Sequence, residues 1–171
     1  AIVDQLRAAH PGALVTRMDL DAEPLPHLSS RSLAGADATE AARAQRALDA
    51  LFGADVVVIG APMYNFSVPS TLKSWIDRVA VAGKTFRYTS AGPQGLLTGK
   101  RAILAITQGG VHALGGASEH QESYLRFVLG FLGIEDVEVV RALGLALSPE
   151  QRAEALASAR ASLDHAARQA A

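Results

Sequence analysis

Two short aliphatic runs without polar alternation organise the rest of the chain. Val56 to Ile59 is one, ended by Gly60-Ala61-Pro62, and a second lies within the strand predicted over Lys100 to Thr107. Strands with this pattern are covered by helices on both faces, as in a parallel sheet. A further strand is predicted over Val137 to Val140. Ala13 to Asp19 alternates apolar with charged positions, which predicts an edge strand.

Helical spacing separates these strands. The chain opens in the last part of a helix that ends at His10-Pro11-Gly12, and Gly83 is expected to cap another. Ser118 with Gln121 resembles a capping box at a helix start. Lys84 to Gly95 is expected to be a long, turn-rich, functional loop. The other predicted helices cover Thr39 to Phe52, Pro69 to Ala82, Ser118 to about Gly130 or Leu132, and Ser148 onwards.

This alternation predicts an α/β fold with a doubly wound parallel sheet and right-handed crossovers. The common five-stranded version has strand order 2-1-3-4-5. Only four strands are visible, so we expect the first strand to precede Ala1 and the natural N-terminus to be missing from this sequence. Residues 1–171 are expected to form a single domain.

Composition excludes several function classes. An apolar content of 49% with 19% charged residues is typical of globular domains, and a net charge of -1 gives no basic field for nucleic acid or an anionic membrane. The sequence shows no membrane-spanning run and no signal peptide. With no cysteine there is no disulfide or thiolate chemistry, and the histidines lack metal-ligand spacing. We therefore expect a cytoplasmic protein without a metal site.

Candidate binding residues follow the first apolar strand. Ligands of open α/β sheets bind outside the carboxyl ends of the strands. There, Pro62 is followed by Met63-Tyr64-Asn65-Phe66. Backbone amides and the Asn65 side chain could hydrogen-bond a flat heterocycle, with Met63 and Tyr64 giving apolar and edge contacts. The alternative is that these residues only cover the end of the sheet.

The next apolar strand ends in a second candidate loop. Thr107 leads into Gln108-Gly109-Gly110, followed by His112. Glycines there would let the backbone approach a ring face, although an ordinary turn has the same sequence. His112 is either a plain loop histidine or a group near the substrate.

Aromatic residues outside these two loops have either a structural or a functional interpretation. Phe86 and Tyr88 are either core residues or part of a mobile lid. The helix from Tyr124 to Phe131 is apolar nearly all round, which favours a dimer contact over the alternative of a deeper monomer core.

Five motifs together resemble the FMN-dependent NADH-azoreductase family of bacterial quinone reductases. They are Ala-Pro-Met-Tyr-Asn-Phe (61–66), Leu-Lys-Ser-Trp-Ile-Asp-Arg-Val (72–79), Gly-Lys-Thr-Phe-Arg-Tyr-Thr (83–89), Gly-Pro-Gln-Gly-Leu-Leu-Thr-Gly-Lys (92–100) and Gln-Gly-Gly-Val-His (108–112). The resemblance implies a flavodoxin-like homodimer with one tightly bound FMN per subunit at the dimer interface. It also implies ping-pong reduction of quinones and azo compounds: NADH or NADPH reduces the flavin and leaves, and the acceptor takes its place.

The resemblance assigns roles to residues. Met63 to Phe66 match the family's first flavin loop, and Gln108, Gly109 and Gly110 match its second. His112 matches a histidine close to the flavin, Tyr88 a lid aromatic, and Phe131 an aromatic that the partner subunit offers over the site. The resemblance also makes His112 a possible positioning or proton-supplying group.

The sequence departs from the family pattern at two places. Thr107-Gln108 replaces a Ser-Arg pair found in some members, which bears on the choice of nicotinamide and on the flavin potential. The family's serine-rich phosphate loop has no counterpart here. The competing hypotheses are a flavodoxin-type electron carrier, which would suit an acidic monomer, and a receiver domain, which would need an Asp where this chain has Pro62 and Met63.

Overall fold

The computed structural model describes residues 2–168, without the side chains of residues 164–168. The helices are α1 (Ile2–Ala9), α2 (Ser30–Leu33), α3 (Ala38–Gly53), α4 (Ser70–Val79), α5 (Glu122–Leu132) and α6 (Pro149–Arg168). The strands are β1 (Val56–Pro62), β2 (Phe86–Thr89), β3 (Gly92–Gly95), β4 (Arg101–Thr107) and β5 (Asp136–Ala142).

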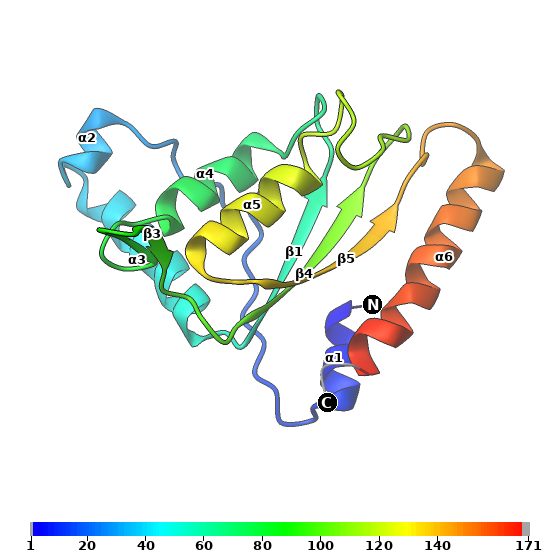
Figure 1. The fold of residues 1–171 in the computed structure, drawn as a ribbon, viewed down its shortest axis with the longest axis horizontal. Helices are drawn as coiled ribbons and strands as arrows, with labels where there is room; N and C mark the ends of the chain where they lie inside the picture. The colour runs from blue at the N-terminus through cyan, green and yellow to red at the C-terminus, as the bar shows by residue number, and fades with distance from the viewer. Residues whose placement is uncertain (1, 169–171) are drawn as a thin grey trace.

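Within these residues a three-stranded parallel sheet has the order β1-β4-β5. Figure 1 shows α3, α4 and α5 on one face of this sheet and α1 and α6 on the other. Successive strand residues divide between two cores: Leu104 and Ile106 pack with the α3–α5 side, whereas Ile103 packs with the α6 side. The unalternated apolar runs thus predicted the covered faces correctly, because a strand buried on both sides needs no polar face.

The segment from Ala13 to Asp19 is not a strand, and this prediction was wrong. It lies exposed, and Leu14 keeps 98% of its side-chain surface accessible. A strand is stabilised by ladder hydrogen bonds to a neighbour, and among residues 2–168 this segment pairs with none. The described residues therefore show part of the predicted five-stranded order, β1-β4-β5, and not all of it.

Three local predictions also need correction. Lys84 to Gly95 is mostly an antiparallel hairpin, β2–β3, in which Phe86 pairs with Gly95. Strand β1 continues through Pro62, although Gly60 was expected to stop it. Helix α4 ends at Val79, before Gly83, because the Thr85 hydroxyl binds the backbone there: it donates to Val79 O at 2.6 Å and accepts from Val81 N at 2.9 Å.

Helix α5 begins at Glu122, and the predicted capping box of Ser118 and Gln121 is absent. The Glu119 carboxylate takes this role by accepting hydrogen bonds from the backbone N–H groups of Gln121 and Glu122 at 2.8 and 2.6 Å. A carboxylate at a helix N-terminus satisfies free N–H groups and is favoured by the helix dipole. At the other end, Gly133 adopts φ 100°, a left-handed cap that suits glycine.

Helix α5 buries most of its apolar side chains at least partly and leaves one exposed. Leu125, Leu129 and Leu132 are buried, whereas Phe127 stays 73% exposed, so the helix keeps one apolar position in solvent. None of the helices in the described part of the chain is both long and apolar enough to span a membrane.

Candidate functional site

Two loops meet at the carboxyl edge of the sheet, one after β1 and one after β4 (Figure 1). The Met63 N–H donates to Thr107 O at 2.8 Å, which joins the start of the first loop to the end of β4. The structure thus brings together the two groups of residues that the sequence selected, Pro62 to Phe66 and Thr107 to His112.

The first loop is a tight turn with unusual backbone angles. Tyr64 N donates to Ser67 O at 2.9 Å and Ser67 N to Tyr64 O at 3.1 Å, so Asn65 and Phe66 form the tip. Their φ angles are 48° and 73°. Asparagine tolerates a positive φ, but for phenylalanine it is an outlier that costs about 1–3 kcal/mol and is typical of functional sites.

The strained turn presents aromatic side chains outward. Tyr64 is 62% exposed and Phe66 52% exposed. The Phe66 ring meets His112 edge-to-face, with 5.6 Å between ring centroids. The His120 N–H donates to Phe66 O at 3.1 Å, which ties the turn to the segment before α5. The exposed aromatics are therefore held on an anchored backbone.

The second loop is fixed from below by β5 and the chain after it. Gln108 N donates to Ala142 O at 3.0 Å, and Gly144 N donates to Gly110 O at 2.8 Å. Ala146 N donates to Gly109 O at 2.9 Å. The last two bonds use the carbonyl groups of Gly110 and Gly109. Their N–H groups have no acceptor among the described residues.

The same holds for the turn of the first loop. Within residues 2–168, the N–H groups of Asn65 and Phe66 also lack a protein acceptor. Main-chain donors from both loops thus remain available at one edge of the sheet, beside the exposed Tyr64 ring. Such an edge could bind the oxygen and nitrogen atoms of a flat heterocycle.

His112 lies against the glycine pair. Its Nδ1 atom lies 2.8 Å from Ser118 Oγ. A Cβ on Gly110 would come within 3.3 Å of His112 Nε2, so glycine lets the imidazole lie close to the backbone. Ser118, expected in a capping box, instead orients this histidine.

Sequence reasoning missed two buried polar residues behind the loops. Gln121 is fully buried, and Glu119 is 4% exposed. Burial raises the pKa of Glu119, but the hydrogen bonds from the backbone N–H groups of Glu122 and Gln121 outweigh it and hold the pKa below its usual range. The sequence signal for Glu119 was an acidic residue just before a helix; Gln121 gave no signal beyond the mistaken capping box.

The predicted lid residues Tyr88 and Phe131 lie around Phe86, in another part of the fold from the two loops. Phe131 packs on Phe86 with 4.6 Å between ring centroids, and Phe86 meets Tyr88 edge-to-face at 5.6 Å. Phe86 is a core residue, as one of the two readings held, whereas Tyr88 is 74% exposed.

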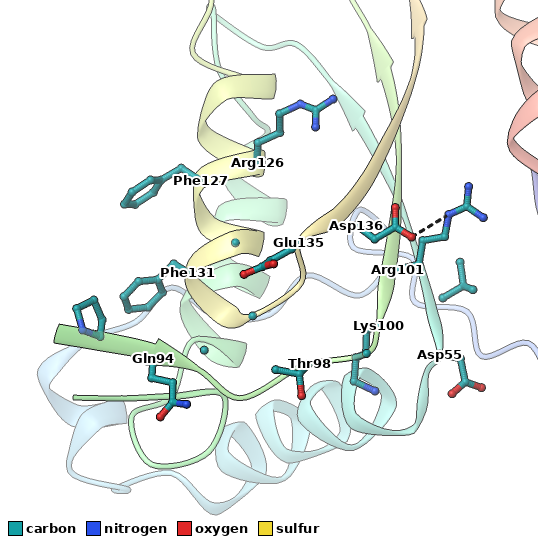
Figure 2. Close-up of a pocket in the computed structure, with 16 residues that line it drawn as sticks. Asp55, Gln94, Thr98, Lys100, Arg101, Arg126, Phe127, Phe131, Glu135 and Asp136 are labelled. Carbon is teal, nitrogen blue, oxygen red and sulfur yellow. Dashed lines mark ion pairs between the residues drawn. The ribbon is translucent and has the colours of Figure 1, made fainter. Parts of the chain in front are cut away.

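Phe131 lines a broad depression near the amino ends of the parallel strands. The depression is lined by Phe127 and Phe131 together with Val56, Arg101 and Asp136, the first residues of the three parallel strands. Figure 2 shows both phenylalanines projecting from α5 on the side away from the parallel strands. Because Phe131 lies toward the amino ends of the strands, it does not meet the two loops at the carboxyl ends within one chain.

The described residues contain no group of three His, Asp or Glu side chains arranged to hold a metal ion. Charged residues near the loops are instead paired. Glu122 is buried, and Arg141 and Arg126 donate to it at 2.5 and 2.8 Å. Burial raises the pKa of Glu122, and the two guanidinium groups more than reverse this effect and lower it.

Comparison with known proteins adds independent evidence. A family model described as a flavodoxin-like fold matches residues 1–166. The chain is 56% identical over 163 residues to the FMN-dependent NADH:quinone oxidoreductase 1 of Xanthomonas euvesicatoria pv. vesicatoria (strain 85-10), an alignment that covers 95% of this chain and 84% of the relative. It is 53% identical to the FMN-dependent NADH:quinone oxidoreductase of Stenotrophomonas maltophilia (strain K279a), covering 95% of this chain and 83% of the relative.

Solved structures agree. The crystal structure of azoreductase AzrA matches with a TM-score of 0.85 and 31% identity, covering 99% of this chain and 87% of the other. An FMN-dependent NADH-azoreductase from Bacillus anthracis str. Ames Ancestor, solved in complex with FMN, matches with a TM-score of 0.82 and 26% identity, covering 99% of this chain and 89% of the other.

Proposed function

This chain belongs to the flavodoxin-like family of FMN-dependent NADH:quinone oxidoreductases, and from that premise we propose how it works. It binds FMN at the carboxyl edge of the sheet, oxidises NADH, and reduces quinones. The observation that carries the location of the site is the set of main-chain N–H groups at Asn65, Phe66, Gly109 and Gly110, which have no acceptor among the described residues.

The residues present fit a flavin ring. The N–H groups on the two loops match a heterocycle with polar atoms along its edge, and Asn65 adds a side-chain amide beside them. Met63 and Tyr64 would contribute apolar and aromatic contact, and the absence of a side chain at Gly109 and Gly110 lets the backbone reach the ring. In this proposal Pro62 and Thr107 end the two strands that set the spacing of the loops.

The chemistry needs little acid–base machinery from the protein. Bound FMN supplies the hydride chemistry between NADH and the acceptor. The loops would bind and orient the flavin, and NADH and the acceptor would occupy one site in turn, which gives ping-pong kinetics. His112, held by Ser118 at 2.8 Å, is placed to hydrogen-bond the acceptor through the ring nitrogen that faces Gly110.

The positions of Tyr88 and Phe131 support a homodimer. Each lies with Phe86 on a part of the fold away from the carboxyl-edge loops. If these aromatics cover a site, that site belongs to a second copy of the chain. We propose that the α5 surface with its exposed Phe127 and the β2–β3 hairpin lies at the subunit interface, where Tyr88 and Phe131 of one subunit close the flavin site of the other.

An assay of NADH oxidation with a quinone, with and without added FMN, tests the function. The expected result is turnover that depends on FMN, parallel lines in double-reciprocal plots, and a yellow protein. Colourless protein without FMN-dependent turnover would overturn the proposal. An azo dye replaces the quinone in a second assay, since the solved neighbours include azoreductases, and it should be bleached in the presence of NADH.

A further inference from the structure

A chain of hydrogen bonds runs through the protein beneath the two loops. Gln121 Nε2 donates to Ala61 O at 2.7 Å. Gln108 Nε2 donates to Gln121 Oε1 at 3.2 Å, and Gln108 Oε1 accepts from the His112 N–H at 3.2 Å. Ala61 is the second-last residue of β1, just before the first loop, and His112 lies at the far end of the second loop. Two side-chain amides thus span the base of both loops.

The direction of this chain is fixed by its ends. A carbonyl such as Ala61 O can only accept, and a backbone N–H such as that of His112 can only donate. Each amide between them must therefore turn its NH₂ group toward Ala61 and its oxygen toward His112. Flipping either one would set donor against donor or acceptor against acceptor, so the arrangement has a single satisfied state.

The fold itself does not explain these two buried amides. Gln121 is fully buried and Gln108 is 4% exposed, yet the side chain of Gln121 makes no capping bond to α5. The Glu119 carboxylate already accepts from the first N–H groups of that helix. Burying an amide is costly unless its hydrogen bonds are made. Here those bonds are made to Ala61, near the end of β1, and to His112 in the second loop.

We infer that Gln108 and Gln121 form a two-amide relay that sets the spacing and orientation of the two flavin loops, with Gln121 acting as a positioning residue for FMN. The inference rests on the proposed function, because it assigns the loops to a flavin. It adds a specific dependence: the geometry of the donors at Gly109 and Gly110 is set by Gln121, the buried residue directly before α5.

The test uses Gln121→Met, Gln108→Met and the double variant, since methionine has a similar length but makes no amide hydrogen bonds. The control is Gln45→Met, at an exposed glutamine of α3. FMN affinity is measured by quenching of flavin fluorescence on titration with apoprotein. We expect each single variant to weaken FMN binding by about tenfold, the double variant to be little weaker than either single one, and the control to match the wild type.

A second measurement needs no flavin. Hydrogen exchange at the His112 N–H of the apoprotein should be faster in Gln121→Met, although Gln121 does not contact His112. Affinities within twofold of the wild type, or additive losses in the double variant, would overturn the relay. A wild-type protein that fails to bind FMN would instead overturn the proposed function, while the exchange rate of His112 would still report on the relay. If Gln121→Met does not fold, Gln121→Glu removes the donor to Ala61 O while keeping the length of the side chain, and the same two measurements apply.

Discussion

At the residue scale, main-chain groups and a few polar side chains define the candidate site. His112 is held by Ser118 Oγ at 2.8 Å and lies edge-to-face on Phe66, so its ring has a defined orientation. A single well-placed hydrogen bond to an acceptor is worth about a factor of ten in binding.

His112→Ala is therefore expected to lower kcat/KM for quinone and azo acceptors by about tenfold, with a smaller effect on FMN binding. Steady-state kinetics on the flavin-loaded protein checks this, and His120→Ala, at an exposed histidine, serves as the control. Unchanged turnover in His112→Ala would remove this residue from the mechanism.

Glu119→Gln should destabilise the protein by about 1 kcal/mol at neutral pH, because the carboxylate accepts hydrogen bonds at the start of α5. The folded protein holds the pKa of Glu119 below its ordinary value of 4.5. The stabilisation is thus fully present above that value and is lost as the pH falls through the lower folded pKa.

Urea unfolding of the wild type and of Glu119→Gln between pH 7 and pH 3 measures this effect. The difference in free energy of unfolding should shrink as the pH falls. The exposed Glu154 of α6 provides the matched control, Glu154→Gln. A difference that stays constant with pH would contradict the capping role.

At the element scale, the hairpin β2–β3 is tied to the end of α5. Leu97 N donates to Leu132 O at 2.9 Å, and a Cβ on Gly95 would lie only 2.2 Å from Gly133 N. Backbone meets backbone here, so only glycine fits. This contact holds the elements that carry Tyr88 and Phe131 together.

Gly95→Ala should accordingly lower the free energy of unfolding by about 1–3 kcal/mol, since the added methyl group overlaps backbone atoms that cannot move aside alone. The midpoint of urea unfolding measures the loss. Gly60→Ala is the control, because a Cβ at that strand position meets nothing within 4 Å. Equal stability of the two variants would show that the hairpin does not pack on α5 in this way.

Sequence patterns predicted elements well where the cause is local. Apolar runs located the strands of the sheet, and Asp37, whose carboxylate accepts from Thr39 N at 2.9 Å, marks the start of the helix predicted at Thr39. The edge strand over Ala13 to Asp19 was wrong, because alternation shows that a segment can pair but not that a partner is present. Gln108 was predicted as a site residue, but its hydrogen bond to Gln121 was not, since this contact joins residues from separate elements.

At the scale of the whole molecule, the predicted site residues form two groups. Met63 to Phe66 and Gln108 to His112 lie at the carboxyl edge of the sheet, and Tyr88 and Phe131 lie with Phe86 elsewhere. In the proposed dimer, twofold symmetry would bring the loops of one subunit together with Tyr88 and Phe131 of the other.

Subunit mixing tests this arrangement. Gly110→Leu should block the flavin loop, and Phe131→Ala should damage the site of the other subunit, so each variant alone is impaired. Unfolding and refolding the two together should restore roughly a quarter of wild-type activity, because half of the dimers are mixed and each has one intact site. No recovery, with native-like dimers confirmed by light scattering, would contradict the shared site.

The N–H groups of Asn65, Phe66, Gly109 and Gly110, which have no acceptor among the described residues, have a consequence for variation among descendants of this protein. Every amino acid except proline supplies a backbone N–H. In the proposed site, the side chains at Asn65 and Phe66 can therefore change over evolutionary time, and with them the preferred oxidant, while the backbone still binds the flavin, provided that Gly109 and Gly110 stay glycine.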